Sequence, residues 1–477
     1  MNQEPPVSEL NRRAFMRTAL SAGAAFCIVP RHVLGGPNQV APSDKINVAI
    51  IGCGGQSLID MDNLIKFPEI QYVAMADPMK EWDYREFYFG GFAGREAAKR
   101  KAEDYYAGQR GKSSFKSIRT YADFREMLDQ ESGIDAVTIE TTDNLHALAT
   151  LAALEKGKHV YCQKPLTHDI YEARVVTEAA RKAGVATQMG NQGHAMEGNR
   201  LVYEWINAGA IGDVREVHCW TDRPGGRWPQ GVDVPEETPS VPRVLDWNLW
   251  LGPARYRAYH PIFCPFRWRG FWDFGTGSLG DMGCHIMDTP VWALDLRHPE
   301  SVEAVMTTPY KDDTYPVAAM IQYEFPERDG RAPVSLTWYD GGLMPFRPKE
   351  LEDKRRMGDS GGGVLLIGDK GTIMCGTYGD NPRLIPETEM KKFTPPPKTL
   401  KRTEGIYHEW VEACLGGDPA TSNFDYSGPL TEVVLLGNVA MRFPNTRLYY
   451  DGANMKVTNI EEADQYIKRQ YHGGWSL

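Results

Sequence analysis

The sequence predicts an α/β protein whose first half is a doubly wound parallel sheet of the Rossmann type. Three observations predict it: an apolar run leads directly into a glycine-rich turn, further apolar runs alternate with helical stretches, and polar residues follow each run. The chain has 477 residues, a length that favours two or three domains, each able to bury its own core.

The composition is that of a globular protein with an acidic charge balance. Hydrophobic residue types make up 42% of the chain and charged types 24%, which excludes intrinsic disorder. Lysine and arginine total 53 against 63 aspartates and glutamates, so the formal net charge is −10. Nucleic acids and anionic membranes attract basic surfaces, so neither is expected as the main partner.

Residues 1–40 are predicted to be a twin-arginine signal peptide. Arg12 and Arg13 precede an apolar run over 18–30 that is too short to span a bilayer. The alternative is a chance arginine pair ahead of a buried helix. We expect export of the folded protein to the periplasm, with no membrane insertion after the signal is removed.

The first predicted strand, 46–51, runs into a turn that suits a dinucleotide. Gly52, Gly54 and Gly55 let the backbone turn sharply and approach a pyrophosphate. Together with Gln56, they place backbone amides at the start of the next helix, where phosphate oxygens bind. The third glycine of the usual GxGxxG pattern is absent, so the turn alone would also fit an ordinary connection after a strand.

The second predicted strand, 72–76, ends at Asp77. A carboxylate at this position accepts hydrogen bonds from the ribose hydroxyls of adenosine and repels a 2′-phosphate. The expected cofactor is therefore NAD, with NADP less favoured.

Two further predicted strands, 135–139 and 159–162, are also followed by polar residues. In a doubly wound sheet, ligands bind beyond the carboxyl ends of the strands, so these residues should meet the cofactor. We expect cofactor contacts from Thr141, Thr142, Asn144, His146, Gln163 and Lys164.

Together, these motifs resemble the Gfo/Idh/MocA family of nicotinamide-dependent sugar and polyol oxidoreductases, over nearly the whole chain after the signal. The resemblance implies a Rossmann domain over 44–192 and an α+β domain with an open, mostly antiparallel sheet over 193–455, followed by a tail over 456–477. It also implies that the second domain carries the substrate side and the interface of a homo-oligomer. The segments that carry the resemblance are the glycine turn, Asp77, 141–146, 164–165, 188–192 and 280–285.

The resemblance also implies which residues act. Lys164, Asp281 and His285 match family residues that line the catalytic cleft, and Asn191 lies in a segment matched to the cofactor side. The chain departs from the family at Gln163, where a glutamate is usual. The exchange keeps a hydrogen-bonding group but removes a negative charge beside Lys164.

Asp281 and His285 are four residues apart, so they share one face of a predicted helix. Asp288 and Asp295 extend this face, and Pro290 is expected to kink the helix or limit its regular part. The alternative interpretation is an amphipathic helix with a solvated acidic face and a structural histidine.

Oxidation of an alcohol needs a hydride acceptor, which nicotinamide supplies, and a proton acceptor at oxygen. His285 is expected to accept the proton, because histidine titrates near neutral pH. Asp281 would either orient the imidazole or bind a second hydroxyl of the substrate. Lys164 would either stabilise the developing alkoxide or hold the nicotinamide ribose.

Aromatic and basic residues precede the predicted helix. Trp268, Arg269 and Trp272 are expected to bind the substrate together with Asp281, because aromatic rings stack on sugar C–H faces and guanidinium groups bind hydroxyls or carboxylates. Packing in the core is an equal alternative for Trp268 and Trp272, and is the expectation for Trp247 and Trp250.

Beyond residue 300 the pattern becomes strand-like, with strands expected over 317–321, 334–338 and 363–368. A helix is expected over 404–415, and the polar tail 461–477 is expected to dock on another subunit. The eight cysteines have no metal-ligand spacing, so isolated buried thiols and no metal site are expected.

Three functions remain open on the sequence. The first is a periplasmic oxidoreductase that transfers a hydride between a tightly held nicotinamide cofactor and a hydroxyl carbon of a sugar, polyol or glycoside. The second is a redox-neutral NAD-dependent glycosidase or lyase that oxidises its sugar transiently. The third is a catalytically silent carbohydrate-binding protein.

Overall fold

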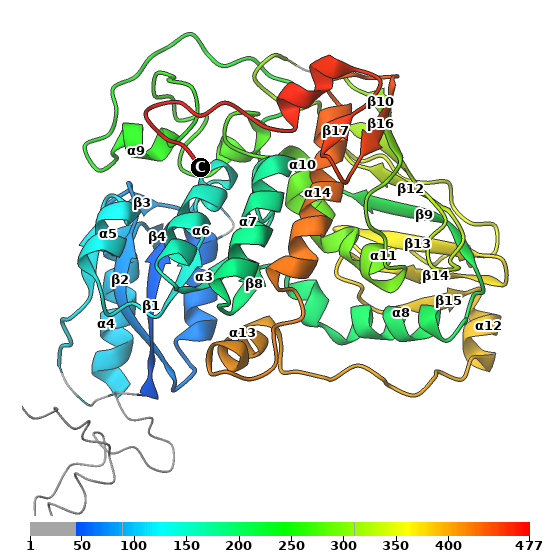
Figure 1. Ribbon diagram of the computed structural model, residues 1–477, viewed down its shortest axis with the longest axis horizontal. Helices are drawn as coiled ribbons and strands as arrows, with labels where there is room; N and C mark the ends of the chain where they lie inside the picture. Colours follow the sequence, from blue (N-terminus) through cyan, green and yellow to red (C-terminus); the bar gives the residue numbers. More distant parts are fainter. Residues whose placement is uncertain (1–43, 88, 110, 112, 310) are drawn as a thin grey trace, which may run out of the picture. The chain divides into compact units, whose positions relative to one another are not determined.

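The computed structural model describes residues 44–87, 89–109, 111, 113–309 and 311–477 (Figure 1). The predicted signal peptide, with Arg12 and Arg13, lies outside the described residues. Residues Ile46–Leu477 form one compact unit that contains both large sheets.

A six-stranded parallel sheet forms the first half, in the order β5-β2-β1-β6-β7-β8. Every neighbouring pair is parallel, and the order reverses direction next to β1, as in a Rossmann fold. The prediction of a doubly wound sheet is confirmed. The strands are β1 (Ile46–Ile51), β2 (Ile70–Ala76), β5 (Arg119–Tyr121), β6 (Ala136–Ile139), β7 (His159–Cys162) and β8 (Thr187–Met189).

The central strands β1 and β6 are short and mainly apolar because helices cover both faces of the sheet. Helix α7 (Ile170–Ala183) has clear start and stop signals: Asp169 and Glu172 form a capping box, and Gly184 ends the helix with a φ of 63°. The helices of this half are α3 (Gly55–Leu64), α4 (Arg95–Gln109), α5 (Phe124–Gln130), η2 (Asp143–Leu145), α6 (His146–Glu155) and α7 (Ile170–Ala183), and a small hairpin joins β3 (Trp82–Asp83) to β4 (Phe92–Ala93).

A nine-stranded sheet forms the second half, in the order β15-β14-β13-β9-β12-β11-β10-β16-β17. The β9–β12 pair is parallel and the other pairs are antiparallel, as the resemblance implied. The strands are β9 (Val214–Thr221), β10 (Ser301–Thr307), β11 (Ala319–Phe325), β12 (Val334–Tyr339), β13 (Gly362–Gly368), β14 (Gly371–Cys375), β15 (Arg383–Ile385), β16 (Arg447–Asp451) and β17 (Lys456–Val457).

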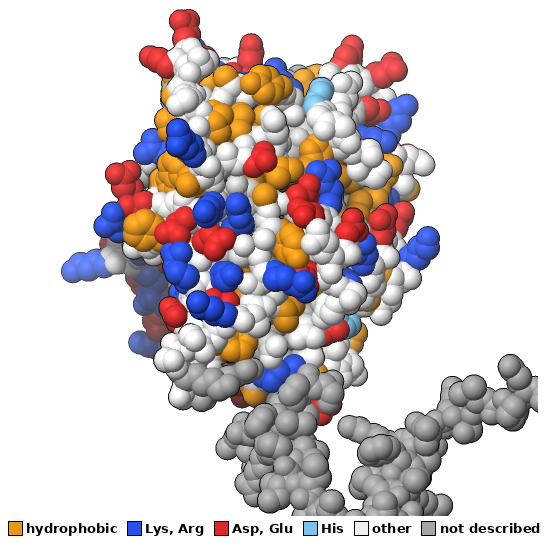
Figure 2. Space-filling model, turned by 90° about the vertical axis from the view of Figure 1, so that its left-hand side faces the viewer, with side chains coloured by type: hydrophobic (Ala, Val, Ile, Leu, Met, Phe, Trp, Pro, Cys, Tyr) orange, Lys and Arg blue, Asp and Glu red, His pale blue; other side chains and the backbone are white. Residues whose placement is uncertain are grey.

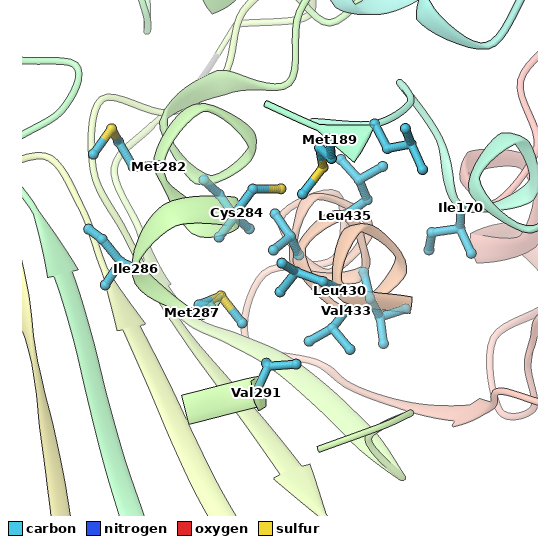
Figure 3. Packing of buried hydrophobic residues seen from close by; sticks show 14 of the residues in the cluster. Ile170, Met189, Met282, Cys284, Ile286, Met287, Val291, Leu430, Val433 and Leu435 are labelled. Atoms are coloured by element: carbon cyan, nitrogen blue, oxygen red, sulfur yellow. The ribbon is translucent and has the colours of Figure 1, made fainter. Parts of the chain in front are cut away.

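Helix α14 (Phe424–Ala440) lies between the two halves, where it packs against both α7 and α10 (Gly277–Ile286). Figure 3 shows Leu430 and Leu435 of α14 close to Cys284 of α10 and Met189 of β8. One continuous hydrophobic core therefore serves both sheets. The remaining helices are η3 (Gln192–Ala195), α8 (Glu197–Asn207), α9 (Trp247–Leu251), η4 (Arg267–Gly270), α11 (Asp288–Ala293), α12 (Glu387–Lys392), α13 (Ile406–Cys414) and η5 (Glu461–Tyr466).

The helical segment over 281–295 is interrupted near Pro290, as expected, and forms two helices. Helix α10 ends at Ile286 and α11 begins at Asp288, so the break precedes Pro290, which sits in the first turn of α11 where a missing amide donor costs little. Asp288 is fully buried, and Asp295 lies beyond α11 with a φ of 51°. The alternative interpretation, a helix with a solvated acidic face, is therefore wrong, since every residue of α10 is buried.

The C-terminal tail makes several contacts with the Rossmann half of its own chain. Arg469 pairs with Glu172 of α7 at 2.5 Å and donates to the carbonyl of Asn144 at 2.6 Å. Trp475 stacks on Phe124, with 5.9 Å between ring centroids. The tail thus packs on helices α5 and α7 of the Rossmann half.

The other sequence expectations mostly hold. Strands β11, β12 and β13 and helix α13 form where strands and a helix are predicted. The seven cysteines within the described ranges are free thiols, six of them buried and Cys414 partly so. Over the same ranges, no helix is both long and apolar enough to cross a bilayer. The face shown in Figure 2 intersperses acidic and basic side chains.

Candidate active site

A cavity of about 670 Å³ opens at the carboxyl edge of the parallel sheet and extends to η4 and α10 of the second half. Residues that follow four parallel strands line one side, and residues of η4 and α10 line the other. Fourteen predicted site residues lie in its wall: Gly52, Gly54, Gly55, Gln56, Asp77, Thr141, Thr142, His146, Gln163, Lys164, Trp268, Arg269, Asp281 and His285.

Two glycines of the turn after β1, Gly52 and Gly55, have no room for a side chain. Gly52 has a φ of +89°, and a Cβ added there would lie 2.6 Å from the backbone of Glu140 and of Thr141. Gly54 precedes the first residue of α3, and a Cβ on Gly55 would lie 2.8 Å from Phe89. The turn therefore brings bare backbone and the amino end of α3 to the cavity, as a phosphate site requires.

Asp77 supports this turn as well as facing the cavity. Its carboxylate accepts hydrogen bonds from the amide of Cys53 at 2.5 Å and from the amide of Met79 at 2.6 Å. Burial raises the pKa of Asp77 to about 6, although both amides stabilise the ionised form. The side chain that is predicted to bind the ribose thus also fixes the backbone around the phosphate site.

Lys164 and Asp281 form an ion pair across the cavity. The Nζ atom of Lys164 lies 2.7 Å from Oδ1 of Asp281 and 2.9 Å from its backbone oxygen. Arg269 Nε is 3.3 Å from the same Oδ1, and Arg223 Nε is 3.8 Å from Oδ2. Burial acts to raise the pKa of Asp281, but Lys164 and the two arginines outweigh it and hold the pKa well below its usual range.

His285 lies one turn of α10 beyond Asp281 and is only 3% exposed. Its ring meets Tyr378 edge to face at 5.0 Å, and its Nδ1 atom is buried without a hydrogen-bond partner among the described residues. Burial, and then the charge of Lys164, push the pKa of His285 well below its ordinary value. The imidazole is therefore neutral at physiological pH and able to accept a proton.

Three predicted site residues lie beside the cavity but do not line it. Asn144 is buried, where it donates to the carbonyl of Leu251 at 3.1 Å and accepts from Thr142 at 2.6 Å. Asn191 accepts from Ser422 at 2.5 Å. Trp272 packs against Tyr315, with ring centroids 3.5 Å apart, so the structure gives it a packing role.

Both halves also contribute site residues that the sequence analysis missed. Asp143 accepts from Thr276 at 2.6 Å and pairs with Arg269 at 3.3 Å, which fixes the guanidinium beside Asp281. Arg223 follows β9 and Tyr378 follows β14, and both line the cavity. Asp143 could have been found, since it lies inside the polar loop after β6, but no local motif marks the other two.

The tryptophans predicted near the site divide between the cavity wall and the core. Trp268 lines the cavity and lies 4.4 Å from the Arg269 guanidinium. Trp247 and Trp250 stack on each other at 4.8 Å in a buried cluster, as expected for core residues, although Trp250 also reaches the cavity wall. No group of three metal-ligating side chains occurs in the part of the chain that the structure describes.

Comparison with known proteins agrees with this architecture. Residues 92–191 match a family model described as the oxidoreductase family, NAD-binding Rossmann fold, and residues 228–332 match one described as the oxidoreductase family, C-terminal alpha/beta domain. The chain carries both domains of the Gfo/Idh/MocA oxidoreductase family. Its Rossmann half is accordingly an NAD-binding domain, and the glycine turn and Asp77 fit that cofactor.

Relatives of this Gfo/Idh/MocA chain include sugar enzymes. 1,5-Anhydro-D-fructose reductase from Ensifer adhaerens is 39% identical over 87 residues, which cover 18% of this chain and 26% of that protein. Levoglucosan dehydrogenase from Pseudarthrobacter phenanthrenivorans is 25% identical over 167 residues, covering 35% of this chain and 34% of the relative. The chain thus spans about a quarter to a third of the length of these relatives.

Two solved structures share the fold of this chain. The WlbA dehydrogenase from Bordetella pertussis, in complex with NADH and UDP-GlcNAcA, aligns with a TM-score of 0.54 at 16% identity, over 85% of this chain and 99% of that one. A levoglucosan dehydrogenase in complex with NADH and levoglucosan aligns with a TM-score of 0.52 at 16% identity, with the same coverage.

Proposed function

We propose that the protein is an NAD-dependent oxidoreductase that transfers a hydride between a tightly held nicotinamide cofactor and a hydroxyl carbon of a sugar, polyol or glycoside. The observation that carries this proposal is one cavity that holds the glycine turn, the Lys164–Asp281 pair and the neutral His285. Relatives named as sugar dehydrogenases and reductases support the substrate class.

The cofactor would lie along the carboxyl edge of the parallel sheet. Its phosphates would face the amides at Gly54 and Gly55, and its adenosine ribose would face Asp77 at the end of β2. The nicotinamide end would then lie near Thr141 and Lys164, which follow β6 and β7.

Different groups around the nicotinamide end would carry out different parts of the reaction. The bound nicotinamide would accept or give the hydride. His285 would take the proton of the substrate hydroxyl on its neutral imidazole. Lys164, held by Asp281, would stabilise negative charge at the reacting oxygen. Trp268 and Arg269 would bind the rest of the sugar.

Replacing Asp77 with alanine is expected to weaken NAD binding by about 10-fold or more, because a hydrogen-bonded charge contributes roughly 1.5–3 kcal/mol. NADP binding should fall less, because the variant no longer repels a 2′-phosphate. Titration of both cofactors by protein fluorescence measures the ratio of the two Kd values. Asp83→Ala, which removes a more exposed acid nearby, is the matched control. An unchanged ratio in the Asp77→Ala variant would contradict the proposed role.

Export and assembly form part of the same proposal. Arg12 and Arg13 support a twin-arginine signal, and a folded enzyme exported to the periplasm would have to carry its NAD with it. Such an enzyme would reduce and reoxidise the cofactor within one cycle, either with two sugars in turn or as a redox-neutral glycosidase. The homo-oligomer would use the open face of the nine-stranded sheet. Light scattering of the purified protein measures its mass and so tests whether an oligomer forms.

One experiment separates the three functions. The purified protein, without added cofactor, is mixed with a panel of sugars and glycosides while absorbance of reduced nicotinamide and release of free sugar are followed. Reduced nicotinamide supports the oxidoreductase, and glycosidic cleavage without it supports the redox-neutral enzyme. Inertness toward the whole panel, together with NAD found after denaturation, would favour a binding protein and overturn the proposal.

A further inference from the structure

The residue before Lys164 is held from two sides. The Nε2 atom of Gln163 donates to Oδ2 of Asp60 at 2.7 Å, and its Oε1 atom accepts from the backbone amide of Lys164 at 3.2 Å. A Cβ on Gly190 would lie 2.7 Å from the amide carbon of Gln163, so the backbone after β8 confines the amide from a further side. The amide thus has one orientation, with its donor toward Asp60 and its acceptor toward Lys164.

Asp60 is the centre of this arrangement. It lies on the inner face of α3, only 1% exposed, and its second oxygen, Oδ1, accepts from Gln56 at 2.7 Å and from the hydroxyl of Tyr407 at 2.8 Å. The carboxylate therefore connects α3, the end of β7 and α13. The three donors named here, the amides of Gln56 and Gln163 and the hydroxyl of Tyr407, are all neutral.

A second buried acid lies close to Asp60. Glu140 follows β6, and both of its carboxyl oxygens are buried next to Asp60. Burial, and then the nearby Asp60, raise the pKa of Glu140 well above its ordinary value. Position 163 thus faces a region that already holds two acids and needs a hydrogen-bond donor.

We propose that Asp60 is a positioning residue for the hydride transfer proposed above, acting through Gln163 on Lys164. It fixes the amide of Gln163, which in turn fixes the backbone from which Lys164 reaches Asp281. Position 163 carries an amide and not a carboxylate because a carboxylate there would meet Asp60 at hydrogen-bond distance without a proton between them.

Four enzymes test the proposal: wild type, Gln163→Glu, Asp60→Asn and the double variant Asp60→Asn/Gln163→Glu. Each single variant is expected to lose about 10²-fold in kcat, because misplacement of a catalytic group by about 1 Å has that effect. The double variant should recover most of the loss, since the new amide at position 60 donates to the new carboxylate at 163. Asp62→Asn, on the same helix but half-exposed and paired with Lys101 at 2.6 Å, is the control and should keep full activity.

The pH profile separates positioning from a merely structural role. In Gln163→Glu, protonation of either carboxylate, at position 60 or 163, restores a hydrogen-bond donor between them. The ratio of kcat to that of wild type should therefore rise as pH falls. In the double variant that ratio should stay flat. The titratable groups that interact with Asp60 are Glu140, which follows β6, Tyr72 on β2, Tyr161 on β7 and Tyr407 on α13; none of them changes between the variants.

The outcomes are distinct. Rescue in the double variant, with the acid-side recovery of Gln163→Glu, supports the proposal. An active wild type whose single variants keep full kcat, or whose double variant stays as slow as Gln163→Glu, would overturn the role of Asp60 and leave the proposed function intact. A wild type that turns over no sugar would overturn both.

Discussion

The His285→Ala variant should lose about 10²–10⁴-fold in kcat, the effect usual for removal of a general base. Its affinity for NAD should be little changed, because His285 lies on α10 and not in the Rossmann half. Stopped-flow kinetics with the preferred sugar measures the first quantity, and fluorescence titration with NAD measures the second. The expected result is a bound cofactor that is no longer reduced.

A control for this variant is available on α13. His408 is 41% exposed and does not line the cavity, so His408→Ala should retain full turnover. If His285→Ala turned over its sugar at a rate near that of wild type, proton transfer would have to be assigned to another group.

The Lys164→Met variant should lose about 10²–10³-fold in kcat/KM, as removal of one donor to a developing oxyanion usually does. Methionine keeps the length of the side chain and removes its charge. The substitution also tests the electrostatics of the site, because Lys164 lowers the pKa of His285. Activity requires neutral imidazole, so it is lost as pH falls through the pKa of His285; without the ammonium this pKa rises, and the acid limb of the kcat/KM profile should move to higher pH.

Lys156→Met provides the matched control, since Lys156 pairs with Asp129 at 2.7 Å on a surface away from the cavity. Its profile should superimpose on that of the wild type. An acid limb that stays in place or moves to lower pH in Lys164→Met would show that the two groups do not share an electrostatic environment.

The Rossmann half could be predicted from the sequence because its signals are local. A buried parallel strand is a continuous apolar run, and the turn after it needs glycine where the backbone is crowded, as at Gly52. Asp77 directly follows the next strand, and it reaches the same edge of the sheet because the two strands are parallel. Such features need only a few consecutive residues to be recognised.

The second half of the site is set by long-range packing, which a single sequence does not reveal. Arg223 and Tyr378 arrive from loops after β9 and β14, and only the folded sheet brings them to α10. Trp272 shares its segment with Trp268, yet it packs on Tyr315 while Trp268 lines the cavity. The break before Pro290 likewise depends on how α10 and α11 each pack.

The position of Lys164 opposite Asp281 could be predicted from the sequence only in part. The four-residue spacing of Asp281 and His285 predicts one helix face, but it says nothing of a lysine far away in the chain. The resemblance to the family implied that these three residues line one cleft. The structure shows that Lys164 and Asp281 form an ion pair there, at 2.7 Å. Asp60, by contrast, could not be inferred, since its link to Gln163 depends on tertiary packing around α3.

Helix α14 has a consequence for how this molecule can move. Because its side chains fill a core shared by both sheets, a hinge-like opening of the halves would expose apolar surface to water. Ligands should therefore enter through shifts of the surface segments that border the cavity. For the same reason, heating should melt Ile46–Leu477 in a single cooperative calorimetric transition, with no separate melting of a nucleotide-binding lobe.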